Sequence, residues 1–231
     1  MKILVVIPAR GGSKGIKDKN IIDVCGKPLI QYSIDQSLEL KKISLVNEII
    51  ISTDSQKIAE IGRKLGANVP FLRPESISGD KAKSIDFILH AINYYEEKNI
   101  FFDAVLLLQP TSPMRDGKLL ESAIKLFKEG KSDSLISCYK EEYINDLVMY
   151  KSKVGNVLIP LNEKHNKGVR RQDHGDVFVR NGAIYLTSVK YLKETEQIIS
   201  DYPLLIEMRK SQSINIDTLE DLEILKRALC K

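Results

Sequence analysis

Short runs of apolar residues alternate with longer amphipathic segments through the first half of this sequence. The runs cover residues 3–7, 49–51 and 104–108, and each gives way to a proline or to small polar residues. Unbroken apolar runs of this length are typical of strands buried on both faces of a parallel sheet. Alternation of such strands with helices predicts an α/β fold with a doubly wound, mainly parallel sheet and right-handed crossovers.

The segments between and after these runs show helical spacing. We expect helices over residues 28–40, 56–65, 84–98, 118–128 and 218–229. Ser55 stands where a helix N-cap is expected, and Gly66 marks the end of the same helix. A further strand is predicted over residues 183–187, before the closing helix.

The pattern changes after about residue 137. Two short apolar pieces, 147–150 and 157–159, flank a turn at 153–156 and predict a β-hairpin. A hairpin is too small to hold a core of its own, and exposed apolar surface usually binds a partner. We therefore expect one domain over residues 1–231, with a dimerisation hairpin inserted at about 139–170 and a homodimer as the assembly.

The first strand leads into a loop rich in glycine and basic residues. Glycines tolerate unusual backbone angles and let backbone N–H groups approach an anion, and the cations add positive charge. The glycines are Gly11, Gly12 and Gly15, and the cations are Arg10, Lys14 and Lys19. At the carboxyl end of a first strand such a loop indicates phosphate binding, the alternative being a solvated glycine turn. It lacks the spacing of a P-loop, and no G-x-G-x-x-G occurs, which disfavours kinases and dinucleotide-dependent dehydrogenases.

Charge and cysteine content narrow the partners and the compartment. The 35 basic and 31 acidic residues leave a formal charge of +4, too small and too dispersed to predict binding to nucleic acid or to a membrane. Cys25, Cys138 and Cys230 are far apart and form no C-x-x-C pair, which favours free thiols in a reducing cytoplasm. No segment has the length of a membrane span.

Several motifs, in order along nearly the whole chain, resemble those of the acylneuraminate cytidylyltransferases, the CMP-sialic acid synthetase family, which includes the legionaminic and pseudaminic acid enzymes. They lie at residues 7–20, at Arg73-Pro74 with Ser84, at 108–115, at Arg171-Gln172 with 181–185, and at 216–218. The resemblance implies a Rossmann-like nucleotide-diphospho-sugar transferase fold. It also implies transfer of CMP from CTP to a nine-carbon α-keto acid sugar, with release of pyrophosphate, for surface glycan biosynthesis.

The resemblance assigns roles to particular residues. Lys14, Lys19 and Asp217 are the implied catalytic residues. The residues implied to bind CTP are Arg10, Gly11, Gly12, Ser13, Asn20, Arg73, Ser84, Gln109, Thr111 and Ser112. Those implied to bind the sugar are Arg171, Gln172, Asn181 and Tyr185. The planar guanidinium of Arg171 suits the sugar carboxylate, and a glutamine amide suits a pyrimidine edge. Tyr185 taken alone is more typical of a core residue.

A divalent cation, Mg²⁺, is the cofactor that the resemblance implies. Family members carry two aspartates two residues apart, whereas this chain has Asn215 and Asp217. Asn215 keeps an oxygen but loses a charge, so the metal would rest chiefly on Asp217. The alternative is that Asp217 helps to cap the last helix.

Two other functions remain open at this stage. One is the related Kdo cytidylyltransferase, whose first loop lacks the Gly-Gly-Ser-Lys-Gly pattern. The other is a non-catalytic sugar-nucleotide-binding protein on the same fold, which Asn215 makes thinkable. The sequence leaves open which acid sugar is used.

Overall fold

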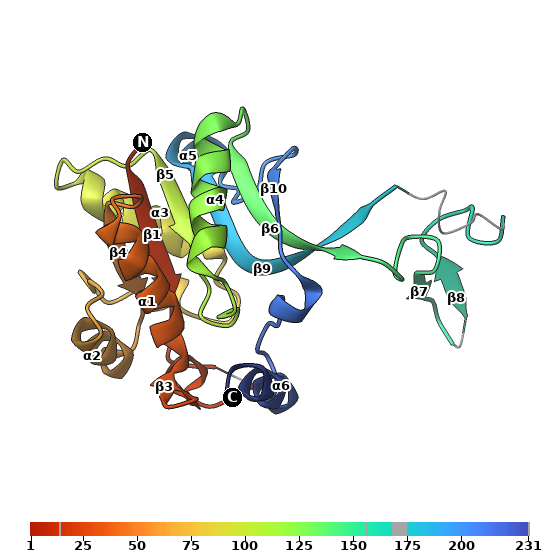
Figure 1. The fold of residues 1–231 in the computed structure, drawn as a ribbon, viewed down its shortest axis with the longest axis horizontal. Helices are drawn as coiled ribbons and strands as arrows, with labels where there is room; N and C mark the ends of the chain where they lie inside the picture. The colour runs from red at the N-terminus through yellow and green to blue at the C-terminus, as the bar shows by residue number, and fades with distance from the viewer. Residues whose placement is uncertain (14, 156, 168–174, 231) are drawn as a thin grey trace.

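A computed structural model describes residues 1–13, 15–155, 157–167 and 175–230 of the chain (Figure 1). The strands are β1 (Ile3–Pro8), β2 (Asp23–Val24), β3 (Lys27–Pro28), β4 (Glu48–Ser52), β5 (Ala104–Leu107), β6 (Ser134–Glu141), β7 (Tyr150–Ser152), β8 (Leu158–Pro160), β9 (Val177–Ser188) and β10 (Leu204–Glu207). The α-helices are α1 (Leu29–Lys42), α2 (Gln56–Lys64), α3 (Ser84–Glu96), α4 (Gly117–Glu129), α5 (Val189–Thr195) and α6 (Leu219–Leu229). Short 3-10 helices are η1 (Lys19–Ile21), η2 (Glu75–Ile77) and η4 (Lys210–Gln212).

Six strands form the central sheet, in the order β10-β6-β9-β5-β1-β4. The pairs β1–β4, β1–β5 and β6–β10 are parallel, whereas β9 runs antiparallel to both of its neighbours. The predicted doubly wound, mainly parallel α/β fold is therefore confirmed. The sequence patterns did not predict β6 and β10 as sheet strands, nor the antiparallel course of β9 between β5 and β6.

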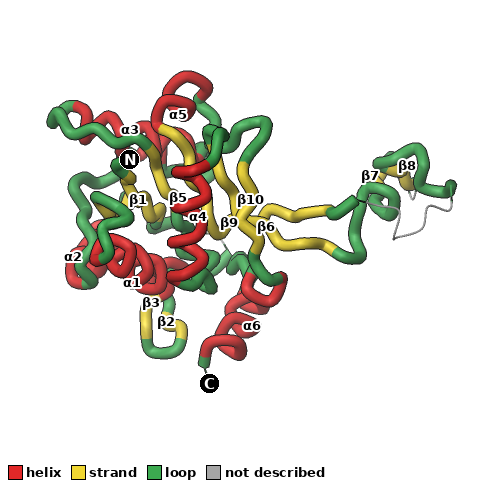
Figure 2. The backbone as a smooth tube through the Cα atoms, turned by 45° about the horizontal axis from the view of Figure 1, so that its top comes forward, coloured by secondary structure: helices red, strands yellow, loops and turns green. Residues whose placement is uncertain are grey.

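Side chains alternate along β1 between two cores, as the two-residue period of a strand requires. Ile3, Val5 and Ile7 join the core under α1, α2 and α4. Leu4 and Val6 join the core under α3 and α5. All five are fully buried, so β1 has helices on both faces, as its unbroken apolar run predicts (Figure 2).

The helices begin close to the predicted positions. The Ser55 hydroxyl accepts the backbone N–H of Ile58, which makes it the predicted N-cap of α2. Thr218 caps α6 through a capping box with Asp221. Within the described residues, no helix combines the length and the apolarity needed to cross a membrane.

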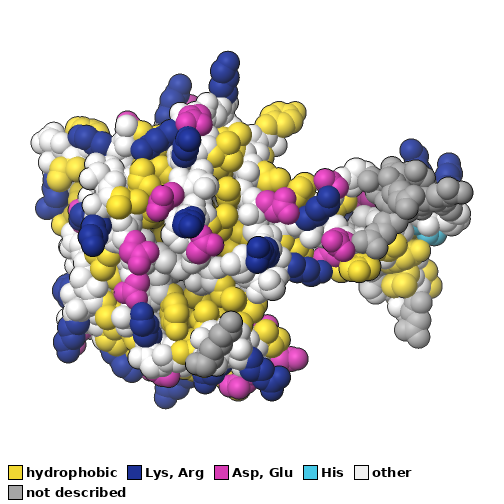
Figure 3. Space-filling view, viewed as in Figure 1, with side chains coloured by type: hydrophobic (Ala, Val, Ile, Leu, Met, Phe, Trp, Pro, Cys, Tyr) yellow, Lys and Arg dark blue, Asp and Glu magenta, His cyan; other side chains and the backbone are white. Residues whose placement is uncertain are grey.

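An arm extends from one end of the sheet (Figure 1). The outer halves of β6 and β9 form its stem, and β7 and β8 form a separate two-stranded hairpin at its tip. Exposed apolar side chains gather on the arm around this hairpin (Figure 3). They include Val154 in the turn, 93% exposed, and Val148, Met149, Tyr150, Val157, Leu158, Ile159 and Leu161, each between 40% and 61% exposed.

A disulfide joins Cys25 to Cys230, at a sequence separation of 205. This corrects the expectation of three free thiols, since Cys138 alone is a buried free cysteine among the described residues. Cys25 and Gly26 both have positive φ angles, 54° and 79°, in the two-residue turn between β2 and β3. The C-terminal end of α6 lies beside this turn. Cys25 and Cys230 are therefore neighbours, although no local sequence motif pairs them.

Candidate active site

A cavity of about 550 Å³ opens where β1 and β5 end. This is the edge at which parallel α/β sheets place their ligands. Nine residues predicted to bind CTP or to act in catalysis line the cavity: Arg10, Ser13, Lys19, Asn20, Arg73, Ser84, Gln109, Thr111 and Asp217. They come from segments spread over most of the chain, so the fold gathers the separate motifs around one space.

The first loop closes over this cavity through side-chain contacts. The Asn20 amide donates to the Arg10 carbonyl at 3.0 Å. The backbone N–H of Gly11 donates to the Asp54 carboxylate at 2.8 Å. The Arg10 guanidinium forms an ion pair of 2.6 Å with Asp80, an acidic lining residue that the sequence analysis missed. In this structure the Arg10 cation is therefore held beside the cavity by Asp80.

Gly15 lies very close to the main chain of Asp217. A Cβ atom at this position would lie 2.4 Å from the Asp217 carbonyl oxygen, a distance that backbone atoms cannot relieve without moving. Gly11 and Gly12 are not among the residues with a positive φ angle. At Gly15 the missing side chain lets the loop approach the Asp217 segment.

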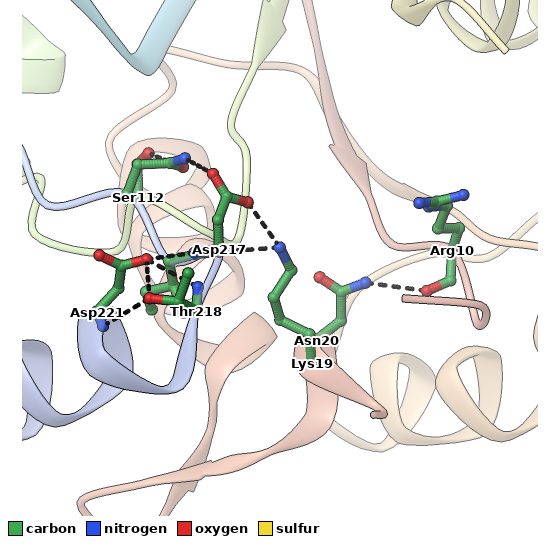
Figure 4. Close-up of polar contacts among 9 residues, drawn as sticks. Arg10, Lys19, Asn20, Ser112, Asp217, Thr218 and Asp221 are labelled. Atoms are coloured by element: carbon green, nitrogen blue, oxygen red, sulfur yellow. Dashed lines mark hydrogen bonds and ion pairs between the residues drawn. The ribbon is translucent and has the colours of Figure 1, made fainter. Parts of the chain in front are cut away.

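Lys19 and Asp217 form the charged centre of the site (Figure 4). The Lys19 ammonium donates to Asp217 Oδ1 at 3.0 Å and to the Ile216 carbonyl at 2.9 Å. Asn215 Nδ2 donates to Asp217 Oδ2 at 2.6 Å, and Asn215 Oδ1 accepts from the Ser112 hydroxyl at 3.3 Å. Both carboxylate oxygens of Asp217 thus have a donor, and Asn215 orients the carboxylate.

Asp217 does not cap the last helix with its side chain. Asp221 Oδ2 accepts the backbone N–H groups of both Asp217 and Thr218, at 3.0 Å and 2.8 Å. Thr218 and Asp221 therefore cap α6, and the Asp217 side chain lines the cavity instead.

Arg73 is buried at the cavity wall. Its guanidinium donates to the hydroxyl and the carbonyl of Ser52 and lies 4.5 Å from the Phe87 ring centre. Burial lowers the pKa of Arg73 to about 10, a shift that the negative charge of Asp54 opposes. The side chain still carries its charge at neutral pH and adds positive potential to the cavity.

A second cavity of about 400 Å³ shares Ser84 and Gln109 with the first. Tyr185, Lys83 and Arg180 are among the residues that line it. The Arg180 guanidinium lies 5.9 Å from the centre of the Tyr185 ring. Arg180 was missed in the sequence although it directly precedes the quoted motif at 181–185, because a single arginine in a strand carries no spacing signal.

The remaining predicted residues lie elsewhere. Lys14, Arg171 and Gln172 fall outside the described residues. Gly11 and Gly12 belong to the loop without lining the cavity, and Ser112 lies behind it, 2% exposed. Asn181 points into the protein and bonds to Ser137, Ser213 and Met208, so it supports β9 from inside.

The donor set at Asp217 fits a cation that the substrate helps to hold. Among the described residues, no group of three His, Cys, Asp or Glu side chains could hold a metal ion without other ligands. Mg²⁺ is commonly bound by one or two carboxylates together with substrate phosphates and water. Asp217 is 66% exposed and faces the cavity, so one carboxylate is accessible for this kind of site.

Comparisons with known proteins agree with this geometry. A family model described as cytidylyltransferase matches residues 4–226. The pseudaminic acid cytidylyltransferase of Campylobacter jejuni is 34% identical over 226 residues, covering 98% of this chain and 95% of the relative. The CMP-N,N'-diacetyllegionaminic acid synthase of Legionella pneumophila is 34% identical over 234 residues, covering 99% and 97%. The N-acylneuraminate cytidylyltransferase of Escherichia coli is 31% identical over 236 residues, covering 96% of this chain and 51% of that protein.

Solved structures share the fold at lower identity. A CMP:2-keto-3-deoxy-manno-octonic acid synthetase complexed with CTP superposes with a TM-score of 0.71 at 18% identity, covering 100% of this chain and 99% of that one. A 4-diphosphocytidyl-2C-methyl-D-erythritol synthase from Anaerococcus prevotii gives 0.67 at 15% identity, with the same coverage. At these identities the likeness concerns the path of the chain and not the substrate.

Proposed function

Because the chain belongs to the cytidylyltransferase family, we propose that it activates a nine-carbon α-keto acid sugar with CTP, giving the CMP-sugar and pyrophosphate. Family membership makes it a nucleotidyltransferase. The observation that carries the proposal is the 550 Å³ cavity, where Arg10, Lys19 and Arg73 supply cations beside Gln109 and Asp217.

The cavity has separate ends for the two parts of CTP. Lys19 and Arg10, with Lys14 of the same loop, are our candidates for the triphosphate, which carries several negative charges. Gln109 and Thr111 follow β5 and offer hydrogen-bond donors and acceptors to the cytosine edge. Ser84, at the start of α3, lines both cavities together with Gln109, and we place it on the nucleoside side of CTP as well.

The reaction is an in-line displacement at the α-phosphorus. The anomeric hydroxyl oxygen of the sugar forms a bond to this phosphorus while the bond to the departing pyrophosphate breaks, and the hydroxyl proton is released. Such transfer depends on positioning and on neutralising charge more than on covalent catalysis. Lys19 holds the Asp217 carboxylate at 3.0 Å, so a cation and an anion are both in place beside the cavity.

We assign the second cavity to the acid sugar. Arg180, Lys83 and Tyr185 line it, and a guanidinium matches a sugar carboxylate with two parallel hydrogen bonds. Arg171 and Gln172 stay part of this proposal from their motif. If Arg171 holds the carboxylate, Arg171→Lys should raise the KM for sugar and leave that for CTP unchanged. If Arg180 holds it, Arg180→Lys should show the same separation.

Mg²⁺ and a homodimer complete the proposal. Asp217, oriented by Asn215, would hold the ion, whose charge would stabilise the negative charge on the phosphate oxygens. The apolar hairpin β7–β8 supports a dimer in which it packs against a second copy of the chain. We also propose a cytoplasmic location, because CTP is a cytoplasmic substrate.

A pyrophosphate-release screen tests the function. CTP, UTP and ATP are each combined with sialic, legionaminic, pseudaminic and Kdo acids, and the product is identified as a CMP-sugar by mass. We expect turnover with CTP and one of the nine-carbon sugars. Equal turnover with UTP or ATP would contradict the cytidylyl assignment.

The same screen separates the two alternatives. Preference for the eight-carbon Kdo would favour the Kdo cytidylyltransferase, which the sequence comparisons support less well than the nine-carbon enzymes. Binding of CTP or of a CMP-sugar without any pyrophosphate release would instead indicate a non-catalytic sugar-nucleotide-binding protein.

A further inference from the structure

Arg115 is a buried arginine that bonds to the main chain of two segments that line the cavities. It is 4% exposed and follows the turn that carries Gln109 and Thr111. One guanidinium nitrogen, Nη1, donates to two main-chain carbonyls, those of Gln109 at 3.0 Å and Ala183 at 2.9 Å. The same nitrogen atom therefore binds one main-chain oxygen just after β5 and one on β9.

The other guanidinium nitrogens anchor Arg115 to α1. Nη2 donates to the Ser33 hydroxyl at 2.6 Å, and Nε donates to Gln36 Oε1 at 3.0 Å. The Gln36 amide in turn donates to the carbonyls of Pro113 and Arg115. The guanidinium is therefore fixed in its plane by a helix that lines neither cavity.

The charge of Arg115 has no acidic partner among the residues that the structure describes. Burial lowers its pKa to about 9, which still leaves the guanidinium charged at neutral pH. Burying a cation against neutral acceptors is costly, and an apolar residue would fill the same space without that cost. The carbonyls that it connects offer a reason for its presence.

Those carbonyls belong to the segments that carry the two proposed substrate sites. Gln109 lines both cavities, and Tyr185 lies two residues beyond Ala183 on β9. Gly182 has a positive φ of 74°, and a Cβ there would lie 3.5 Å from Gln109 Oε1 and 3.7 Å from the Tyr185 hydroxyl. The Gln109 and Tyr185 side chains thus both lie near Gly182, the neighbour of Ala183, whose carbonyl accepts from Arg115.

We propose that Arg115 is a positioning residue that fixes the Gln109 turn relative to β9 and thereby sets the selectivity for cytosine and the alignment of nucleotide with sugar. It touches neither substrate. It acts through the Gln109 and Ala183 carbonyls, and the proposal rests on the function proposed above.

Kinetics of Arg115→Lys test this role. A lysine keeps one positive charge but cannot reach both carbonyls while also bonding to Ser33 and Gln36. We expect the KM for CTP to rise at least about fivefold and the CTP-over-UTP ratio of kcat/KM to fall at least about threefold. Ser33→Ala, which removes the acceptor at 2.6 Å far from the substrates, should shift both quantities in the same direction by a smaller factor.

Leu40→Ala is the matched control. Leu40 is 1% exposed on the same helix α1, near its other end, and contacts neither cavity. Its loss should lower the thermal midpoint and the fraction of active enzyme, with KM and the CTP-over-UTP ratio unchanged, because unfolded molecules do not contribute to turnover. Unlike Leu40→Ala, Arg115→Lys should change KM and the CTP-over-UTP ratio, but only if Arg115 positions the Gln109 turn.

The outcomes separate the two proposals. If Arg115→Lys lowers the thermal midpoint while KM and the nucleotide ratio stay within about twofold of wild type, Arg115 is merely structural. If Arg115→Lys fails to fold, the CTP-over-UTP ratio of Ser33→Ala becomes the test. A ratio equal to that of the wild type overturns the inference. If the wild-type protein itself releases no pyrophosphate with any sugar, the proposed function fails instead, and CTP and UTP affinities by calorimetry then decide on Arg115.

Discussion

At the scale of single residues, Gly15 shows how one missing side chain shapes the site. The loop passes so close to Asp217 that a Cβ would lie 2.4 Å from its carbonyl oxygen. Gly12, three residues earlier, would meet no atom within 4 Å. The loop therefore has room for a side chain at Gly12 but not at Gly15.

This difference predicts different outcomes for two alanine variants. Gly15→Ala must displace the Asp217 segment and should lower the free energy of unfolding by about 1 to 3 kcal/mol, as overpacking does. Gly12→Ala should leave it unchanged. Denaturant unfolding without ligand measures both, and equal stability of the two variants would mean that the loop is farther from Asp217 than described.

Asn215 and Asp217 set the charge available to a cation. Asn215→Asp adds a second carboxylate where the amide now donates at 2.6 Å, and hard cations are held by charge and oxygen count. The variant should reach half-maximal rate at a lower Mg²⁺ concentration than wild type. Asp217→Asn should nearly abolish turnover, because no formal negative charge remains at this pair.

Rate against free Mg²⁺ at saturating CTP and sugar measures these effects. Glu220→Gln is the control, since it removes one exposed carboxylate from the first turn of α6 without changing the cavity lining. It should behave like wild type. Substantial activity of Asp217→Asn would show that other carboxylates hold the cation.

At the scale of elements, the disulfide fastens α6 to the β2–β3 turn. α6 contributes Leu222 and Leu225 to a small core with Ile16, Val24 and Ile216, and Asp217 lies just before the helix. The covalent link spans 205 residues of sequence, so it restricts the unfolded chain strongly. The end of the chain and the Asp217 segment are therefore stabilised together.

Loss of the disulfide should weaken the fold measurably. In oxidising buffer, Cys230→Ser should lower the free energy of unfolding by about 2 to 4 kcal/mol. Dithiothreitol should have the same effect on wild type and no further effect on the variant. If all three cysteines are alkylated after the air-oxidised protein is unfolded without a reductant, the result would contradict the pairing.

At the scale of the whole molecule, the arm carries apolar surface away from the core (Figure 3). Leu158 on β8 is 61% exposed, and Phe101 on the core is 58% exposed. Leu158→Asp should convert the proposed dimer to a monomer, because a charge cannot be buried against the partner's apolar hairpin. Phe101→Asp is the matched control.

Light scattering after size exclusion gives the mass of each variant. We expect a dimer for wild type and for Phe101→Asp, and a monomer of 26.1 kDa for Leu158→Asp. A monomeric wild-type protein, or a Leu158→Asp protein that stays dimeric, would rule out this hairpin as the dimer contact.

The sequence by itself determined the main strands and helices of the first half of the chain. The periods of apolar residues predicted β1, β4, β5 and the main helices to within a few residues, because burial against neighbours within one element leaves a local pattern. The same local reading located the glycine-rich loop at the end of β1, for which phosphate binding stays a prediction. Motif order then predicted which distant segments share a cavity.

Only the tertiary structure decided which segments meet. β9 enters antiparallel between β5 and β6, and Cys25 reaches Cys230, through contacts that no sequence period records. The positions of Asp80, Arg115 and Arg180 relative to the cavities were likewise visible only in the tertiary structure. The partners of Asp80 and Arg115 lie between 6 and 82 positions away and depend on how the elements cross, so each residue alone carries no signal of its neighbour.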